Sequence, residues 1–357
     1  MRRAGADARA GRPARVTIVD VARAAGVRPS TVSKALNGRG SAEVRRRVDE
    51  AVARLGYRPS ARAQGLRTAQ SRSIGVLVPD LVNPSYLALL RGVEHVAQER
   101  GYVVLVADGQ RSADTQAAVL ERFFEHGVDG LVLGGPVPVE ALRLHLQHGV
   151  PISPSVSDDE RALARHWEQG EADATREMGR RLLDLGHRRF ALVSTPALPG
   201  SGRFRRGRVL ALWRLLAEAG AELSVSLVDP DRDPEGCRAQ LRALLAGGDD
   251  GPGGTGDRGA APTALVCVNQ LVAPSVLIAA RDAGRRVPDD LSVVVYGDSD
   301  WAQAHPPPLS VVARDTFAEG RSLAAALLDT IAGVESPRRP ATEARYIERG
   351  SCAPAAP

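Results

Sequence analysis

Residues 17–37 read TIVDVARAAGVRPSTVSKALN, and this stretch decides the fold of the amino-terminal part of the chain. Thr17 can cap a helix, and the apolar residues that follow it recur at the spacing of one helix face. Gly26 supplies the positive φ that a tight turn requires, and Pro29 suits the first turn of a second helix. The pattern therefore predicts two short helices joined by a glycine turn.

The second predicted helix places polar and apolar residues on different sides. Its buried side would carry Val32, Ala35 and Leu36. The outward-facing residues are short or polar: Ser30, Thr31, Ser33, Lys34 and Asn37. A third helix follows, with an apolar side between Val44 and Leu55. Three such helices are typical of a helix-turn-helix unit, whose second helix enters the major groove of DNA, although an αα-hairpin of another bundle shares the pattern.

The charge of the chain is unevenly distributed. The 357 residues carry a net charge of +5, yet residues 1–70 hold 16 Lys and Arg against 5 Asp and Glu. The remaining residues are mildly acidic. A basic head on an acidic body indicates a polyanionic partner for the head, whereas charge alone also fits a solvated basic tail. The helix-turn-helix pattern inside the head favours double-stranded DNA.

A short segment after the third helix, YRPSARAQGLR at residues 57–67, differs from the helices before it. Pro59 restricts Arg58 to extended geometry, so the third helix must end before it. Residues 60–66 are too few for a stable isolated helix, and taken alone they form a linker. Next to a DNA-binding head, the segment would fold on DNA and insert Leu66 between base pairs in the minor groove.

From Ser73 onward the pattern changes to short apolar runs that alternate with amphipathic helices. The predicted strands cover residues 74–78, 103–107, 130–133, 190–193, 264–268 and 291–296. This order predicts an α/β body of two lobes, each a doubly wound parallel sheet with helices on both faces. Ligands of such sheets bind at the carboxyl ends of the strands. Those ends lead into residues 79–86, 107–111, 134–138, 195–206, 269–271 and 296–301.

The stretches TIVDVARAAGV, STVSKALNG, RVDEAVARLGYRP and SIGVLVPDLVNPSY follow one another at a specific spacing. In this order they resemble the lactose/galactose repressor (LacI/GalR) family of bacterial transcription regulators, and the resemblance covers residues 16–350. It implies that Ser30 and Lys34 read bases, and that Arg28 stands where the family usually has a serine that contacts phosphate. The other DNA contacts that it implies are Thr17, Thr31, Ser33 and Asn37 on phosphates and Tyr57, Ser60, Ala63 and Leu66 in the hinge.

The same resemblance implies a periplasmic-binding-protein-like body that closes on a small effector, usually a sugar or a nucleobase. The implied effector contacts are Tyr86, Arg205, Asn269 and Asp298. Three aromatic side chains, Tyr86, Trp167 and Trp301, could stack on a ring, although each also fits a core or rim position. The sequence departs from the family pattern at three places. Gly297 replaces a ligand-facing acid, Gln270 replaces a common Asp, and Gly170-Glu171 replaces an acidic–Asn pair. These departures put an ordinary hexose in doubt, and we expect a sugar or a related metabolite as the effector.

The chain divides into five expected segments: a basic unstructured tail at residues 1–15, a helix-turn-helix domain at 16–58, a hinge at 59–70, an effector-binding and dimerisation domain at 71–350, and a second unstructured tail at 351–357. One lobe of the large domain would contain residues 71–170 plus 312–332. The other lobe would contain residues 171–311 plus 333–350. Residues 309–313 would lead the chain back from the second lobe to the first.

The predicted function is that of a sequence-specific DNA-binding regulator, most simply a repressor, acting as a homodimer on a pseudo-palindromic operator under the control of an effector. We expect it in the cytoplasm, associated with the nucleoid. No nucleophile–base, metal-ligand or paired-cysteine motif occurs, so neither catalysis nor a cofactor is expected. No run of 18 apolar residues occurs, so no membrane span is expected. The alternatives are a regulator that has lost small-molecule binding and a solute-binding protein, although the hinge and the lack of an export signal disfavour the second.

Overall fold

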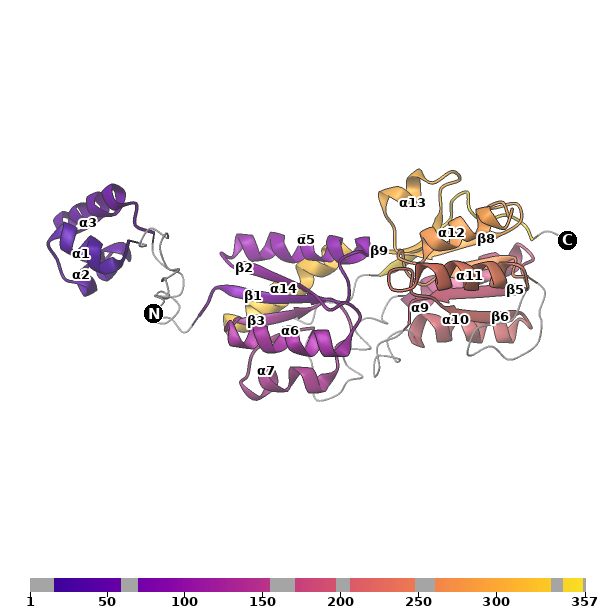
Figure 1. Ribbon diagram of the computed structural model, residues 1–357, viewed down its shortest axis with the longest axis horizontal. Helices are drawn as coiled ribbons and strands as arrows, with labels where there is room; N and C mark the ends of the chain where they lie inside the picture. Colours follow the sequence, from indigo (N-terminus) through magenta and orange to yellow (C-terminus); the bar gives the residue numbers. More distant parts are fainter. Residues whose placement is uncertain are drawn as a thin grey trace, which may run out of the picture. The chain divides into compact units, whose positions relative to one another are not determined.

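The computed structural model describes residues 16–58, 70–154, 171–196, 206–247, 261–334 and 343–355. Its internal contacts divide the chain into two compact units, Met1–Ser71 and Arg72–Pro357, which we call the head and the body (Figure 1). Some predicted features lie outside the described residues: the amino-terminal tail, Ser60, Ala63, Leu66, Trp167, Gly170 and Arg205.

The head contains the three predicted helices, α1 (Ile18–Ala25), α2 (Pro29–Leu36) and α3 (Ala42–Leu55). Thr17 and Asp20 start α1 with a capping box, in which each side chain bonds the backbone N–H of the other residue. Gly26 ends α1 with a φ of 65°, which confirms the predicted glycine turn. The small core comes from all three helices: Val21, Ala22, Ala25, Val32, Ala35, Val48 and Ala51.

The first lobe of the body is a parallel sheet with helices on both faces (Figure 1). The strand order is β2-β1-β3-β4, with β1 (Ser73–Val78), β2 (Val103–Asp108), β3 (Gly130–Leu133) and β4 (Ile152–Ser153). One face is covered by α5 (Pro84–Glu99) and α14 (Thr316–Ile331). The opposite face is covered by α6 (Ala113–Glu125) and α7 (Arg143–Gln147). Burial of both faces explains why β1 and β3 read as continuous apolar runs.

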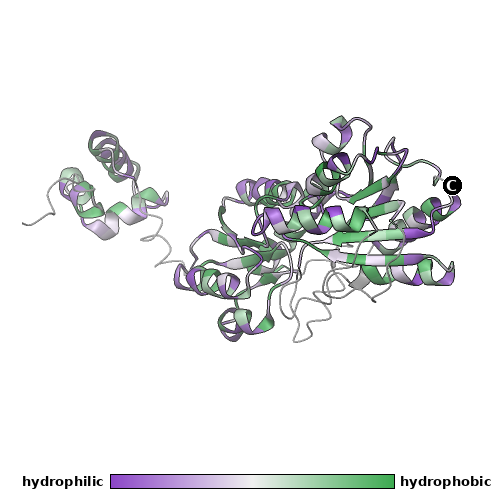
Figure 2. Cartoon of the chain, turned by 45° about the vertical axis from the view of Figure 1, so that its right-hand side comes forward, coloured by the Kyte–Doolittle hydropathy of each residue, from purple (hydrophilic) through white to green (hydrophobic). Residues whose placement is uncertain are grey.

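The second lobe has the strand order β10-β9-β8-β7-β5-β6, and only β10 is antiparallel to its neighbour. Its strands are β5 (Arg189–Ser194), β6 (Glu222–Leu227), β7 (Ala264–Cys267), β8 (Ser292–Tyr296), β9 (Ser310–Arg314) and β10 (Ala344–Ile347). Its helices are α9 (Glu171–Asp184) and α10 (Arg206–Glu218) on one face, α11 (Pro234–Leu245) and α12 (Ala273–Asp282) on the other, and the short α13 (Asp300–Ala304). Figure 2 shows hydrophobic residues concentrated along the strands of the body.

All six predicted strands are confirmed within two residues at either end. The sequence did not predict β4, β6, β9 or β10. The strand β6 lies at an edge of its sheet, and its exposed and buried residues alternate in part, so ELSVSL lacks the continuous apolar run of a central strand. An edge strand of this kind is hard to distinguish from a polar loop.

Two predicted boundaries are wrong. The predicted return to the first lobe at residue 312 comes too early, because β9 continues to Arg314 and pairs with β8 inside the second sheet. The predicted unstructured tail at 351–357 is wrong for residues 351–355. Ser351 is fully buried, and its hydroxyl accepts a hydrogen bond from Ser310 N–H and donates one to the Val293 carbonyl.

Two glycines bring α5 and α14 into direct backbone contact. A Cβ on Gly92 would lie 2.1 Å from the carbonyl oxygen of Phe317, and a Cβ on Gly320 would lie 2.0 Å from that of Leu89. Because any side chain would clash, the two helices can approach this closely only with glycine at both positions. The contact fixes α14 to the first lobe, although α14 follows directly after a strand of the second.

Candidate functional site

The polar side of α2 is the candidate site of the head. Ser30, Lys34 and Asn37 are exposed, and Thr31 and Ser33 are half-buried beside them. Lys34 lies in the last turn of α2, where the helix dipole favours a cation. The Nδ2 of Asn37 donates a hydrogen bond to the Ser33 carbonyl over 2.5 Å. The predicted polar face therefore exists, on a helix anchored by its buried Val32 and Ala35.

Three further predicted residues lie around this helix or at the end of the head. Thr17 Oγ1 donates to Asp20 Oδ2 over 2.7 Å, and this hydrogen bond holds the pKa of Asp20 below its usual value. Arg28 is the exposed residue before α2 and makes no side-chain capping bond. Tyr57 is half-buried and packs against the core of the head. Thr17 and Tyr57 therefore both stabilise the fold of the head, Thr17 through its hydrogen bond and Tyr57 through its packing.

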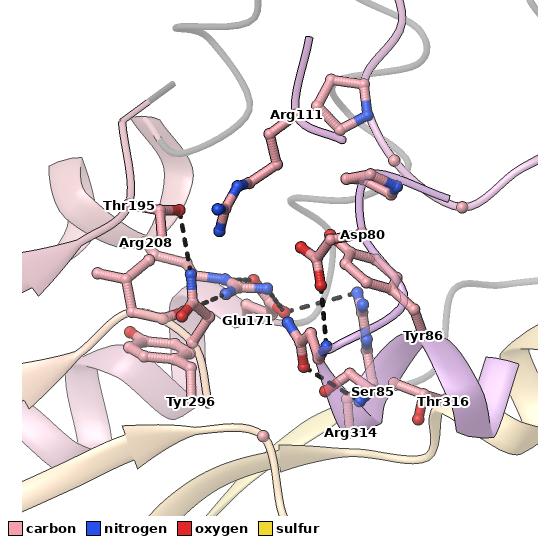
Figure 3. Close-up of a pocket in the computed structure, with 18 of the residues that line it drawn as sticks. Asp80, Ser85, Tyr86, Arg111, Glu171, Thr195, Arg208, Tyr296, Arg314 and Thr316 are labelled. Atoms are coloured by element: carbon pink, nitrogen blue, oxygen red, sulfur yellow. Dashed lines mark hydrogen bonds and ion pairs between the residues drawn. The ribbon is translucent and has the colours of Figure 1, made fainter. Parts of the chain in front are cut away.

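The candidate site of the body is a cavity of about 180 Å³ between its two lobes (Figure 3). Its walls come from loops at the carboxyl ends of the strands, including Asp80 after β1, Arg111 after β2 and Thr195 after β5. The cavity therefore lies where the sequence analysis expects the ligand site, at the carboxyl ends of the strands. A six-membered ring fits such a space, since an engineered cavity of about 150 Å³ binds benzene.

The predicted effector contacts are only partly brought together. Tyr86, Asn269 and Asp298 line the cavity. Trp301 does not line it, because its ring packs against the hydrophobic core of the second lobe. Trp167 and Arg205 lie outside the described residues, so their positions relative to the cavity stay predictions.

Two of the lining residues already have partners within the chain. The Oδ1 of Asn269 accepts hydrogen bonds from the N–H groups of Leu271 (3.0 Å) and Val272 (3.2 Å). The carboxylate of Asp298 is bound by both Nη atoms of Arg349, at 2.9 and 2.6 Å. Both residues therefore shape the wall of the cavity in addition to facing it.

Arg208 is an arginine of the cavity that the sequence reasoning missed. It lies on α10, three residues after the predicted Arg205, and its Nε and Nη2 bind the two carboxylate oxygens of Glu171. Its Nη1 donates to the Val268 carbonyl over 3.0 Å, and its guanidinium lies 4.8 Å from the centre of the Tyr296 ring. Burial opposes the charge of Arg208, but the Glu171 carboxylate outweighs this effect and raises the pKa of the guanidinium.

The position of Arg208 has a signal in the sequence. Leu212 and Leu216 follow it at intervals of four residues, and both are fully buried on α10. A residue one turn before them lies on the same inward face of the helix. The four-residue spacing therefore indicates Arg208, and not Arg205, as the arginine that faces inward.

A buried ion network extends from Arg208 through the connection between the lobes. Arg314, the last residue of β9, lies 3.5 Å from Glu171 and 3.1 Å from Glu319 on α14. Glu171 and Glu319 are 6% and 3% exposed. Buried charges require partners of opposite sign, and this network supplies them from both lobes. Sequence reasoning missed it because its members are far apart in the chain.

Two departures from the family pattern compensate for each other. Gly297 has a φ of 98°, and a Cβ on it would lie 2.6 Å from Nε2 of Gln270. The Gln270 side chain is buried, and its Nε2 donates to Ser85 Oγ of the first lobe over 3.1 Å. Glutamine therefore fills space that an acidic side chain at position 297 would need, and it joins the two lobes.

Among the described residues, no group of three or more His, Cys, Asp or Glu side chains could hold a metal ion. Within the same residues, no helix has the length and apolar character needed to cross a membrane.

Two protein-family models match the chain. The model for bacterial regulatory proteins of the lacI family matches residues 17–60, and the model for a periplasmic binding protein-like domain matches residues 180–352. A curated relative, the HTH-type transcriptional regulator KdgR of Bacillus subtilis, is 27% identical over 346 residues, which are 94% of this chain and 97% of that protein.

Solved structures share the fold over nearly the whole chain. The lac repressor dimer bound to operator and the anti-inducer ONPF has a TM-score of 0.73 and 24% identity, covering 95% of this chain and 99% of the repressor chain. The complex of the transcriptional regulator CelR with cellobiose has a TM-score of 0.61 and 27% identity, covering 94% of this chain and all of that one. A helical head followed by an α/β body of parallel-sheet lobes is therefore the fold class.

The family models, the full-length relative and the structural neighbours agree with the resemblance drawn from the sequence. The relatives are transcriptional regulators and not enzymes. The chain therefore combines a DNA-binding domain of the lacI family with a periplasmic binding protein-like domain, the arrangement of a DNA-binding bacterial transcription regulator.

Proposed function

We propose that this regulator binds a pseudo-palindromic operator as a homodimer, and that a small effector in the cavity controls its affinity for that operator. The observation that carries the proposal is the polar face of α2, which leaves Ser30 and Lys34 exposed on a helix-turn-helix head. A helix of this kind enters the major groove and reads base edges from its amino-terminal part. Ser30 and Lys34 would make the base contacts.

A second group of residues would hold the DNA backbone and the hinge. Phosphate contacts position such a head on the duplex without reading its sequence. The proposed phosphate contacts are Thr17, Arg28, Thr31, Ser33 and Asn37. The proposed hinge contacts are Tyr57, Ser60, Ala63 and Leu66, with Leu66 as the side chain that unstacks a base step.

The proposal requires two copies because one helix-turn-helix buries too little DNA for tight specific binding. Each sheet of the body ends in an edge strand with exposed apolar side chains, Val103 and Val106 on β2 and Val225 and Leu227 on β6. Exposed apolar edge strands favour association with another chain. The lac repressor, which shares this fold, forms a dimer on its operator, and we propose that assembly here.

The cavity would bind a carbohydrate or a related metabolite. Its lining comes from both lobes, so a ligand there interacts differently with open and closed bodies. The relative CelR, of the same fold, was solved with cellobiose. A ligand that prefers one state shifts the equilibrium, and operator affinity must respond reciprocally. We propose relief of repression as the response, on the nucleoid of the cytoplasm.

Genome-wide mapping of binding sites, followed by gel-shift titration of the recovered motif, tests the central proposal. We expect a pseudo-palindrome with two half-sites, and light scattering should show two chains on each operator. A monomeric protein that prefers no sequence among random oligonucleotides at moderate salt contradicts the proposal.

The hinge assignment has its own test. Leu66→Ala should weaken operator binding while the circular dichroism spectrum stays unchanged, because only the wedge side chain is lost. The matched control is Leu87→Ala, at an exposed leucine of the body, which should leave operator binding unchanged. Equal operator affinity for Leu66→Ala and the unmodified protein would refute the wedge.

A further inference from the structure

The carboxylates of the cavity wall are already bonded within the chain. Glu171 is held by Arg208, and Asp298 is held by Arg349. Asp80 is buried and accepts a hydrogen bond from a backbone N–H over 2.8 Å. The hydroxyls of a neutral sugar need acceptors, and ionised carboxylates are the acceptor-only side chains. In the described part of the cavity, these acceptors are engaged before a ligand arrives.

Arg111 offers the opposite kind of group. Its Nη2 binds Asp229 Oδ1 (2.7 Å) and Asp231 Oδ2 (3.1 Å), both on the loop after β6 in the second lobe. Its Nη1 is buried and has no hydrogen-bond partner among the described residues. Figure 3 shows the guanidinium pointing into the cavity, opposite Thr195. A buried donor without a partner is unfavourable, so a ligand acceptor at Nη1 would complete the site.

The backbone fixes the direction of Arg111. Gln110 and Arg111 have φ values of 50° and 48°, a conformation that residues other than glycine rarely adopt. Asp108 Oδ1 accepts from Gln110 N–H over 2.7 Å and holds this turn. From the second lobe, Arg232 Nη2 donates to the Gln110 carbonyl over 2.5 Å. Such conformations persist where the surrounding structure imposes them, often at ligand sites.

We propose that Arg111 selects effectors that carry an oxyanion, a carboxylate or a phosphate, on a sugar-like framework. This inference rests on the proposed function and names the ligand class of its cavity. Arg111 Nη1 donates to the oxyanion while Nη2 stays on Asp229 and Asp231. Because one guanidinium from the first lobe then binds both the second lobe and the ligand, the oxyanion binds the closed body better and favours closure.

Calorimetric titration of the full chain with matched pairs of compounds tests the inference. The pairs are D-gluconate with D-sorbitol, D-galacturonate with D-galactose, and D-glucose 6-phosphate with D-glucose. At least one acid should bind saturably and about 30-fold or more tightly than its neutral partner, as expected when a buried donor without a hydrogen-bond partner gains an anionic acceptor. The first two pairs identify a carboxylate ligand, and the third identifies a phosphate ligand.

Variants assign the preference to Arg111. Arg111→Gln should remove the preference for the acid, and Arg111→Lys should retain part of it. The double variant Asp229→Asn, Asp231→Asn keeps the guanidinium and should still prefer the acid, with weaker affinity because closure is less stable. Arg281→Gln, at an exposed arginine of the second lobe, is the control and should bind as the unmodified protein does.

Several outcomes overturn the inference: no acid binds, a neutral partner binds as tightly as its acid, or Arg111→Gln keeps the preference. Gel shift with the recovered operator on the same preparations separates the two proposals. Operator binding without any preference for an acid removes only this inference. Loss of operator preference in the unmodified protein removes the proposed function itself.

Discussion

The ion pairs between described residues of the head are exposed, whereas the body has exposed pairs and also buries some. In the head, Arg46 and Glu50 form a pair whose side chains are 66% and 61% exposed. In the body, Arg314 and Glu319 form a pair whose side chains are 12% and 3% exposed. Exposed charges stay hydrated and can meet a polyanion, whereas buried charges depend on fixed partners. Charge on the head therefore stays accessible to a polyanion, and buried charge in the body depends on contacts within the chain.

The largest expected effect tests this difference directly. Glu319→Gln leaves Arg314 without one of its buried carboxylates, and breaking such a pair costs about 3–5 kcal/mol of unfolding free energy. Glu50→Gln removes an exposed pair on a helix and should cost at most about 0.5 kcal/mol. Hydrogen–deuterium exchange of the full chain measures both units at once. Similar losses of unfolding free energy for the two variants would contradict this difference between the head and the body.

A second variant probes the way helices pack in the two regions. The head packs its helices through side chains such as Val48 and Ala51, whereas α5 and α14 meet backbone to backbone. Gly320→Ala should destabilise the body by about 1–3 kcal/mol through overpacking, although alanine is the better helix former by about 1 kcal/mol. Thermal unfolding measures the change, and a stabilised variant would rule out the close contact.

A third pair of variants concerns the exposed charge of the head. Lys34→Ala should cost about 1–3 kcal/mol of operator binding and relax specificity at the base it reads. Thr31→Ala removes a proposed phosphate contact and should weaken binding to all sequences alike. Fluorescence anisotropy with operator and scrambled duplexes measures both effects. If the Lys34 variant weakens both duplexes equally, its assignment to bases is wrong.

The smallest expected effect is a pH dependence confined to the body, which contains every histidine of the chain. Burial lowers the pKa of His187, whose ring nitrogens bond Thr263, Ser292 and the Ala353 carbonyl. The unfolded chain takes up a proton near pH 6.5 and the folded chain only below that, so stability is full above about pH 6.5 and falls below it.

His187→Gln should flatten this decline by at most about 1.4 kcal/mol per pH unit. Urea unfolding of the variant and of the unmodified protein, repeated at several pH values, measures the difference. His145 is buried as well, with a pKa lowered by the same cause, and accounts for part of the remaining slope. The protection of the head from hydrogen–deuterium exchange should not fall as the body loses stability below about pH 6.5. A head that loses protection in parallel with the body would contradict this part of the comparison.

The two regions also differ in how far the sequence predicts them. The head follows from neighbouring residues, because Thr17, Gly26 and Pro29 act on the backbone within one turn of their own positions. The strand ends that surround the cavity were predictable for a similar reason, since each follows its own apolar run. Residue partners inside the cavity were not predictable in this way.

Glu171 shows why. Read along the chain, it replaces a residue that the family uses for ligands, and nothing nearby indicates its partners. In the structure it binds Arg208 and Arg314, which are brought to it by α10 and β9. Trp301 shows the opposite case. Because it is a large aromatic residue near a strand end, we predicted that it stacks on a ligand ring, but its side chain packs against the core of the second lobe.

The place of α14 in the chain has a consequence for synthesis on the ribosome. The helix completes the first lobe, yet it is encoded after nine of the ten strands, including all of the second sheet except β10. Until residue 331 has been translated, α5 has no helix to cover Gly92 and its apolar neighbours. The first lobe begins first and is finished almost last, so a nascent chain must protect that uncovered face while the second lobe is made.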